Sequence, residues 1–205
     1  MNIRPKFITL EGVDGAGKST HINFIKKYLA DKSLKYLFTR EPGGTVLGEK
    51  LREILLHDEM TPETESLLMF AGRNEHVYKI IKPNLNKGIN VVSDRFTDAT
   101  YAYQSGGKNV EFSKITILKD WVHKDLKPDL TILFDLPIEV SLSRLKTNGN
   151  LDKFEKEAAD FHKRIRNSYL ELAKKETQRF KIVNSDQNIN LIEKEIISIL
   201  DKLFL

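Results

Sequence analysis

The stretch "EGVDGAGKST", residues 11–20, constrains the fold of this 205-residue chain more than any other part of the sequence. Gly12 and Gly17 enclose four residues, and Lys18 and Ser19 follow at once, which matches the G-x-x-x-x-G-K-[ST] pattern of a phosphate-binding loop. Glycines let the backbone curl until successive N–H groups point inward, and the N-terminus of a following helix adds to the attraction for an anion. The pattern therefore predicts a loop that holds a nucleoside triphosphate, but it does not indicate which reaction follows.

Short apolar runs alternate with longer helical patterns along the chain. The runs that predict strands are "KFITLEG", "KYLFTREPGG", "GINVVSDRF", "DLTILFDLP" and "FKIVNSD". Apolar residues at helical spacing predict helices in "INFIKKYLADK", "GEKLREILLHD" and "LIEKEIISILDKLF". Thr61 before Pro62 predicts the start of another helix, which we expect to run to about Lys82, before Pro83. The fold class is therefore α/β, a three-layer P-loop NTPase fold with a five-stranded parallel sheet and helices on both faces.

The chain shows no linker and no internal repeat, so we expect one P-loop kinase domain over residues 1–205. Its most highly charged stretch, "LKTNGNLDKFEKEAADFHKR", is either a solvated helix pair or a mobile lid, which we place at about residues 144–156. Trp121, the one tryptophan, is expected to pack in the core.

Composition excludes several classes of protein. With 33 Lys plus Arg against 29 Asp plus Glu, the net charge is only +4, which surplus surface lysine explains without a nucleic-acid partner. The chain has no cysteine, so it has neither disulfides nor thiolate metal sites. No apolar stretch approaches the ~20 residues of a membrane span. We expect a cytoplasmic protein with no membrane partner.

Two aspartates end predicted strands and are candidates for the magnesium shell. Asp94 ends "VVSD" and Asp135 ends "ILFD". Either side chain could hold Mg²⁺ or its waters, and either could instead cap the helix that follows.

Arginines near the strand ends indicate what the second substrate carries. Arg40 follows the second predicted strand, Arg95 follows the third, and Arg73 lies on a helix between them. Because the carboxyl ends of parallel strands meet at one edge of the sheet, Arg40 and Arg95 should lie close to the phosphate loop. Guanidinium groups there favour an acceptor that already carries a phosphate. A deoxynucleoside kinase with Glu41 as its base remains an alternative.

A P-loop ATPase or GTPase switch is the other alternative. A regulatory GTPase needs an Asn-Lys-x-Asp segment and an Asp-x-x-Gly after a strand. The "NKGI" that begins at Asn86 lacks the aspartate, and the only Asp-x-x-Gly runs from Asp14 to Gly17, inside the phosphate loop itself. The sequence therefore favours a small-molecule kinase.

Six motifs in a fixed order resemble bacterial thymidylate kinase. They are "EGVDGAGKST", "FTREPGGT", "LLMFAGRNEH", "VVSDRFTDATYAYQSGG", "KPDLTILFDLP" and "LDKFEKE". The resemblance implies transfer of the γ-phosphoryl group from ATP to dTMP, with Mg²⁺ as cofactor, in a homodimer formed through helices. It also implies in-line transfer without a covalent intermediate.

The resemblance assigns roles to matching positions. The residues expected to bind ATP are Gly12, Val13, Asp14, Gly15, Ala16, Gly17, Lys18, Ser19, Thr20 and Arg144. Ser19 and Asp94 would serve Mg²⁺, and Arg40 and Arg95 would bind the acceptor phosphate. Asp14 would meet the 3′-hydroxyl of the acceptor sugar. The residues expected to contact the base and sugar are Phe70, Arg73, Thr100, Tyr103 and Gln104, and the catalytic set is Lys18, Arg95, Asp14 and Lys153.

The chain departs from the family pattern in two places. The aromatic residue that stacks on the base often stands four residues before the base-binding arginine; here Phe70 stands three before Arg73 and Met69 holds the fourth position. Some relatives carry an arginine in the phosphate loop where this chain has Gly15, and others supply one from a lid segment like "LDRxE". This chain resembles the second type with Lys153 in place of the arginine, and Arg144 and Lys146 lie near it in sequence.

Overall fold

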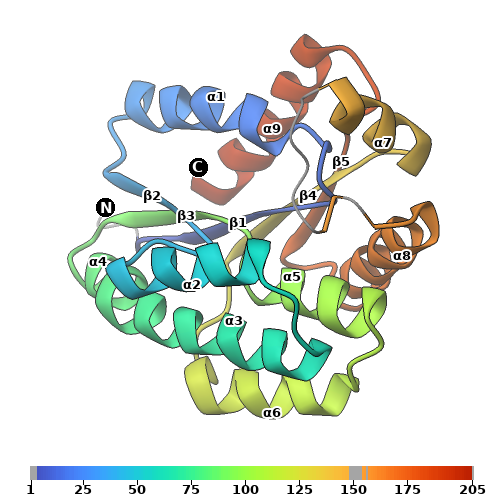
Figure 1. Ribbon diagram of the computed structural model, residues 1–205. Coiled ribbons are helices and arrows are strands. Elements are labelled where there is room, and N and C mark those ends of the chain that lie inside the picture. The colour runs from blue at the N-terminus through green and yellow to red at the C-terminus, as the bar shows by residue number, and fades with distance from the viewer. Residues whose placement is uncertain (1–3, 148–153, 156, 205) are drawn as a thin grey trace.

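The computed structural model describes residues 4–147, 154, 155 and 157–204. Within them, one parallel sheet contains strands in the order β2-β3-β1-β4-β5. The strands are β1 (Phe7–Glu11), β2 (Tyr36–Arg40), β3 (Asn90–Asp94), β4 (Leu130–Asp135) and β5 (Phe180–Asn184). The five strands expected from the sequence are confirmed, and so is the α/β fold class (Figure 1).

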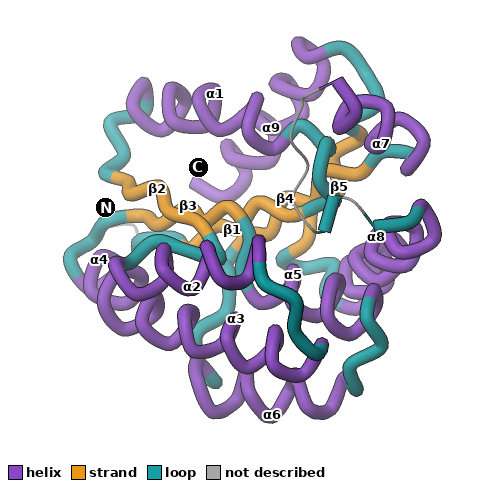
Figure 2. The backbone as a smooth tube through the Cα atoms, in the orientation of Figure 1, coloured by secondary structure: helices purple, strands orange, loops and turns teal. Residues whose placement is uncertain are grey.

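Helices cover both faces of the sheet (Figures 1 and 2). On one side lie α1 (Lys18–Asp31), α7 (Ile138–Thr147) and α9 (Ile189–Phe204). The other side carries α2 (Val46–His57), α3 (Pro62–His76), α4 (Lys82–Asn86), α5 (Thr97–Thr100), α6 (Phe112–His123) and α8 (Ala159–Lys175). The wide helical turns η1 (Val77–Ile81) and η2 (Tyr101–Gly107) continue α3 and α5.

Strand β1 lies at the centre of the core because its run is apolar on both faces. Phe7, Ile8 and Leu10 are at most 1% exposed, as expected for a parallel strand between two helical layers. β1 pairs with β3 on one side and β4 on the other. The loop that follows β1 therefore emerges in the middle of the carboxyl edge, where ligands bind in such sheets.

The helix that begins after Thr61 runs farther than the sequence predicts. Thr61 caps it, with the Thr64 N–H donating to the threonine hydroxyl and Pro62 in the first turn. Pro83 does not end it, because helical backbone continues through η1 to Asn86. Proline has no N–H to donate and its ring crowds the preceding turn, so a widened turn accommodates it inside the helix.

The expectation that Trp121 packs in the core is wrong. It lies on α6 and is 81% exposed, whereas its neighbour Val122 faces the core. Adjacent residues on a helix point in different directions, so one apolar neighbour cannot predict the burial of the next. Within the described residues, no helix combines the length and apolar composition needed to cross a membrane.

Candidate active site

The phosphate loop packs closely against β4 and α7 at two positions where only glycine, which has no side chain, leaves enough room. Gly12 has a φ of +139°, and a Cβ there would lie 2.4 Å from the Phe134 carbonyl oxygen. Gly15 has a φ of +75°, and its Cβ would lie 2.8 Å from the Ser141 carbonyl oxygen. Both positions therefore require glycine in this arrangement. A cationic side chain at position 15 would displace α7, so the loop does not supply one there.

Lys18 is the first residue of α1, and its side chain folds back against the phosphate loop. Its ammonium donates to the carbonyl oxygens of Gly12 at 2.9 Å and Val13 at 3.0 Å. Burial and the nearby Arg95 guanidinium lower the pKa of Lys18. The ammonium is thus held at the loop by weak acceptors, which a phosphate oxygen can replace.

A large cavity, here called the phosphate-loop cavity, opens beside this loop. Its lining includes Asp14, Gly15, Ala16, Gly17, Lys18, Ser19, Thr20, His21, Arg40, Asp94, Arg95, Arg144, Ser185 and Gln187. The sequence-predicted triphosphate residues from Asp14 to Thr20 are therefore brought together with Arg40, Arg95 and Arg144.

The two aspartate candidates for Mg²⁺ differ in their surroundings. Asp135 accepts two hydrogen bonds from Arg166 at 2.7 and 2.9 Å, which occupies both its oxygens. Asp94 lines the phosphate-loop cavity beside Ser19, and its buried Oδ1 has no hydrogen-bond partner among the described residues. A carboxylate and a hydroxyl are oxygen ligands that suit Mg²⁺. The Asp94–Ser19 side of the cavity therefore fits the ion.

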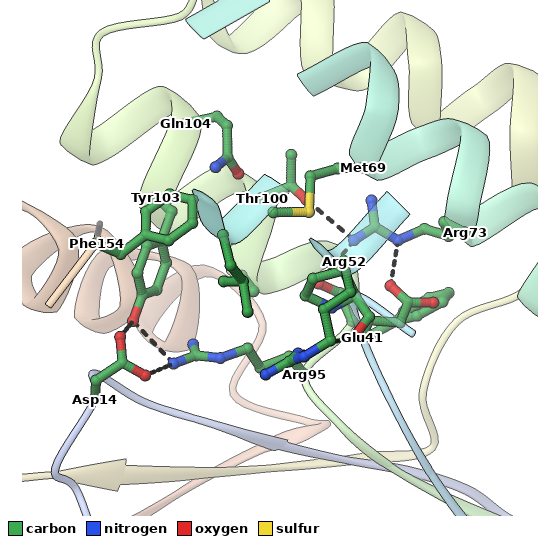
Figure 3. A pocket seen from close by; sticks show the side chains of 14 residues that line it. Asp14, Glu41, Arg52, Met69, Arg73, Arg95, Thr100, Tyr103, Gln104 and Phe154 are labelled. Atoms are coloured by element: carbon green, nitrogen blue, oxygen red, sulfur yellow. Dashed lines mark hydrogen bonds and ion pairs between the residues drawn. The ribbon is translucent and has the colours of Figure 1, made fainter. Parts of the chain in front are cut away.

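A second cavity, the inner cavity, adjoins the first and contains about 580 Å³ of space, part of it open to solvent (Figure 3). Its lining is Asp14, Glu41, Pro42, Arg52, Leu56, Met69, Arg73, Arg95, Phe96, Ala99, Thr100, Tyr103, Gln104 and Phe154. Asp14, Glu41, Arg52 and Arg95 line both cavities. Ligands in the two cavities would therefore face each other across these four side chains.

Asp14, Arg95 and Tyr103 form a connected group at this boundary (Figure 3). The Arg95 guanidinium pairs with Asp14 Oδ1, and the Tyr103 hydroxyl donates to Asp14 Oδ2 at 2.7 Å. Arg95 also donates to the Gly12 carbonyl at 3.0 Å and to the Tyr103 hydroxyl at 2.9 Å. Burial alone would raise the pKa of Asp14, but Arg95 and Lys18 lower it to about 2. Asp14 is therefore a carboxylate that accepts hydrogen bonds at neutral pH.

Glu41 holds Arg73 at the opposite wall. The Arg73 Nε donates to Glu41 Oε2 at 2.7 Å, and the His76 Nδ1 lies 2.7 Å from Oε1. Burial raises the pKa of Glu41, but Arg73 and His76 outweigh it, so the pKa is below its ordinary value. A carboxylate with both oxygens engaged and a lowered pKa is a poor general base. The arrangement therefore does not favour a deoxynucleoside kinase that uses Glu41.

Arg73 keeps one donor for a ligand. Its Nη2 donates to Thr100 Oγ1 at 3.0 Å and to the Phe96 carbonyl at 3.2 Å. Its buried Nη1 has no hydrogen-bond partner among the described residues. Leaving a buried charged donor unpaired is costly, and a ligand acceptor in the inner cavity would remove that cost.

Phe70 and Met69 differ in their placement on α3. Met69 lines the inner cavity, whereas Phe70 is 2% exposed and lies behind Arg73, whose guanidinium carbon is 4.6 Å from the Phe70 ring centre. The structure thus brings Arg73, Thr100, Tyr103 and Gln104 together around the cavity but leaves Phe70 out of its lining.

Comparison with known proteins agrees with this geometry. A family model described as thymidylate kinase matches residues 10–196. The chain belongs to the thymidylate kinase family. It is 53% identical over 198 residues to a thymidylate kinase of Methylobacillus flagellatus, covering 97% of this chain and 98% of that one. A Neisseria meningitidis thymidylate kinase is 48% identical over 201 residues, covering 97% and 98%.

A solved structure supports the same family. The crystal structure of thymidylate kinase from Ehrlichia chaffeensis superposes with a TM-score of 0.79 at 33% identity, covering 97% of this chain and 99% of that chain.

Sequence reasoning missed several residues that line the two cavities. Arg52 on α2 faces both cavities and donates to the Pro42 carbonyl at 3.0 Å. The signal available was a cation on the helix directly after the Pro-Gly-Gly turn. His21 also lines the phosphate-loop cavity; it is 2% exposed, and its Nδ1 has no partner among the described residues. Ser185, equally buried and with an unpartnered Oγ among those residues, lines the same cavity and belongs to the segment after the last predicted strand, residues 184–186, for which the sequence gives only a weak indication of an adenine contact. Nothing in their spacing indicates that they share a wall.

The lid expected at about residues 144–156 is described only in part. Arg144 donates to the carbonyl oxygens of Gly15 at 3.4 Å and Ser185 at 3.1 Å, so it closes one side of the phosphate-loop cavity. Phe154 lines the inner cavity. Lys153, the expected catalytic cation, lies outside the described residues.

Proposed function

We propose that the protein transfers the γ-phosphoryl group of ATP to dTMP, giving dTDP and ADP. The observation that carries this proposal is the shared boundary of the two cavities, where Asp14 and Arg95 face both a phosphate loop and a base-sized cavity with a free arginine donor. Membership of the thymidylate kinase family supports the same reaction.

The inner cavity would bind dTMP. The unpartnered Nη1 of Arg73 would donate to a carbonyl of the thymine ring, and Met69 would lie against the ring face. Asp14 would accept a hydrogen bond from the 3′-hydroxyl. The Tyr103 ring would stand against the sugar and leave little room for a 2′-hydroxyl, which would favour deoxynucleotides.

Charge neutralisation would drive the transfer. Lys18 would bind the β- and γ-phosphates of ATP, while Arg40, Arg52 and Arg95 would neutralise the acceptor phosphate. The acceptor oxygen is already anionic, so no strong base is needed, in accord with the engaged state of Glu41. We propose Lys153 as a further cation on the transferring group.

Ser19 and Asp94 would hold Mg²⁺. When bound, the ion would neutralise charge on the β- and γ-phosphate oxygens. The adenine and ribose of ATP would lie against three other residues of the phosphate-loop cavity, Arg144, His21 and Ser185.

An ADP-release assay with a panel of acceptors tests the proposal. dTMP-dependent turnover is the expected result. Turnover with thymidine but not dTMP would favour a deoxynucleoside kinase, and ATP or GTP hydrolysis without dependence on an acceptor would favour a switch or an ATPase.

We also propose that the chain forms a homodimer through α3 and α6. Leu67 on α3 and Ile117 and Trp121 on α6 are 55%, 67% and 81% exposed, and α3 and α6 lie side by side (Figure 1). Exposed apolar residues that gather on adjacent helices indicate a protein interface. Sedimentation of the wild type and Trp121→Glu tests this, with a dimer expected to become a monomer in the variant.

A further inference from the structure

Gln104 lies at the inner cavity with one end of its side-chain amide already engaged. Its Nε2 donates to Glu65 Oε1 at 2.9 Å. Gln104 is 1% exposed and Glu65 is fully buried. The Lys108 ammonium donates to the other carboxylate oxygen, Glu65 Oε2, at 2.9 Å. Glu65 thus lies between a fixed cation and the amide that faces the cavity.

The carboxylate decides which way the amide faces. A carboxamide has a donor end and an acceptor end that can exchange places by a rotation of half a turn, whereas an ionised carboxylate only accepts hydrogen bonds. Because Glu65 only accepts, the end of Gln104 that meets it must be the amino group. The Gln104 oxygen is left on the side of Thr100 and Met69, toward the cavity (Figure 3).

The direction of the amide matters because pyrimidines differ at ring position N3. Thymine and uracil carry an N3–H between two carbonyls, so they donate at that position. Cytosine has a bare N3 that accepts, beside an amino group that donates. At position N3, an amide with freedom to rotate could pair with either kind of base, whereas one whose oxygen must face N3 can accept from the N3–H of thymine or uracil but meets a second acceptor in cytosine.

We infer that Glu65 is a positioning residue that makes the inner cavity select the imide edge of thymine and reject cytosine. It holds the Gln104 amide so that its oxygen meets the base. Rotating the amide to suit cytosine would place that oxygen against the Glu65 carboxylate and leave two buried acceptors facing each other. Lys108 keeps the carboxylate paired and in place. This inference rests on the proposed phosphorylation of dTMP.

Specificity constants test it. The kcat/KM values for dTMP, dUMP and dCMP are measured for the wild type, Glu65→Gln and the double variant Glu65→Gln/Lys108→Met, which removes the ammonium that the single change leaves unpaired. A glutamine at position 65 can donate or accept, so the Gln104 amide can turn. The matched control is Glu63→Gln, the same change at a half-exposed carboxylate on α3.

We expect the ratio of dTMP to dCMP kcat/KM to fall at least about tenfold in the Glu65 variants, since a base-selecting hydrogen bond is worth that much or more. The ratio of dTMP to dUMP should stay as in the wild type, because the two bases share the imide edge. An unchanged dTMP-to-dCMP ratio, or an equal loss for all three acceptors, would overturn the inference. Wild-type turnover of dTMP tests the proposed function separately.

A crystal structure of the wild type with dTMP decides the matter if neither variant folds. The inference requires one end of the Gln104 amide within hydrogen-bond distance of ring N3 while the other end remains on Glu65. An amide that leaves Glu65 when dTMP binds, or that does not reach N3, would refute it.

Discussion

The two cavities that meet at Asp14 and Arg95 differ in how completely their polar side chains are paired. Around the inner cavity, Arg73 is held by Glu41 and Thr100, and Asp14 by Arg95 and Tyr103. One buried polar atom of its described lining, Arg73 Nη1, has no partner. Around the phosphate-loop cavity, three buried polar atoms have no partner among the described residues: Asp94 Oδ1, His21 Nδ1 and Ser185 Oγ.

This difference separates a site that the protein builds largely by itself, with one arginine donor left for a ligand, from one that depends on its ligands at several atoms. Buried ion pairs fix the inner cavity in advance, so a ligand there loses little free energy in ordering side chains. Unpaired buried groups cost free energy until a ligand or ion meets them. We therefore expect changes at the inner cavity to affect folding as well as turnover, and changes at the phosphate-loop cavity to affect mainly ligand and metal binding.

The largest effect is expected at the boundary. Arg95→Ala removes the guanidinium that faces both cavities, and turnover should fall by a factor of about 10³ or more, as for other arginines that stabilise a transferring phosphoryl group. The ADP-release assay measures it, with Arg95→Lys as the variant that keeps the charge. Near-wild-type kinetics for Arg95→Ala would remove Arg95 from the proposed mechanism.

Glu41→Gln breaks the pairing that defines the inner cavity. Arg73 is 2% exposed, so it would be left as a buried charge without its counter-ion, and the free energy of unfolding should fall by about 3–5 kcal/mol. Urea denaturation measures the loss. The control is Glu49→Gln, which breaks the exposed pair with Arg40 and should cost at most about 1 kcal/mol. Equal losses in the two variants would contradict the comparison.

The pH dependence of stability gives a test at His123, which packs behind Phe96, a residue of the inner-cavity lining. His123 lies against Phe96, accepts from the Thr97 hydroxyl through Nε2 and donates to the Leu126 carbonyl through Nδ1. Burial, with Arg73, lowers its pKa from 6.5 to about 4. The unfolded chain therefore binds a proton that the folded chain does not, and the stability that neutral His123 contributes is lost as pH falls from about 6.5 through 4.

The loss should reach about 3 kcal/mol at pH 4, since each unit of pKa shift corresponds to 1.36 kcal/mol. Thermal or urea unfolding across this range measures the slope. His123→Gln should flatten it, whereas His57→Gln, on the exposed face of α2, should not. A slope that survives in His123→Gln would assign it to another group.

The smallest effect on folding is expected in the phosphate-loop cavity. Asp94→Asn removes a carboxylate whose Oδ1 has no partner among the described residues, so the free energy of unfolding should change by no more than about 1 kcal/mol. The Mg²⁺ concentration that gives half-maximal turnover should rise at least about tenfold. Titrations of Mg²⁺ at saturating ATP measure it, and an unchanged requirement would rule out Asp94 as part of the metal site.

The sequence predicted those parts of the protein that depend on local pattern. The phosphate loop, the five strands and the helix start at Thr61 follow from glycine spacing, apolar runs and a capping residue, all of which act over a few residues. The arginines at the strand ends could be placed because parallel strands share one edge. Family resemblance then supplied the substrates.

The rest depended on contacts between distant segments. The sequence leaves Glu41 available as a base, whereas in the structure Arg73 and His76, more than thirty residues later in the chain, occupy its two oxygens. Met69 and Phe70 stand four and three residues before Arg73, and either spacing lets the side chain lie near Arg73 on the helix, so only the packing of Phe70 behind Arg73 separates the two candidates. A proline inside a helical pattern predicts a helix end, and the widened turn that lets the helix continue past Pro83 leaves no mark in the sequence.

The contact between Arg95 and the phosphate loop has a consequence for how the two substrates bind. Arg95 bonds both to Asp14 and to the Gly12 carbonyl, so it touches the loop that cradles one substrate while it lines the cavity of the other. A nucleotide that shifts Arg95 must also shift these loop contacts. Occupancy of one cavity should therefore change affinity in the other, and thermodynamic reciprocity requires ATP to change the affinity for dTMP by the same factor as dTMP changes that for ATP.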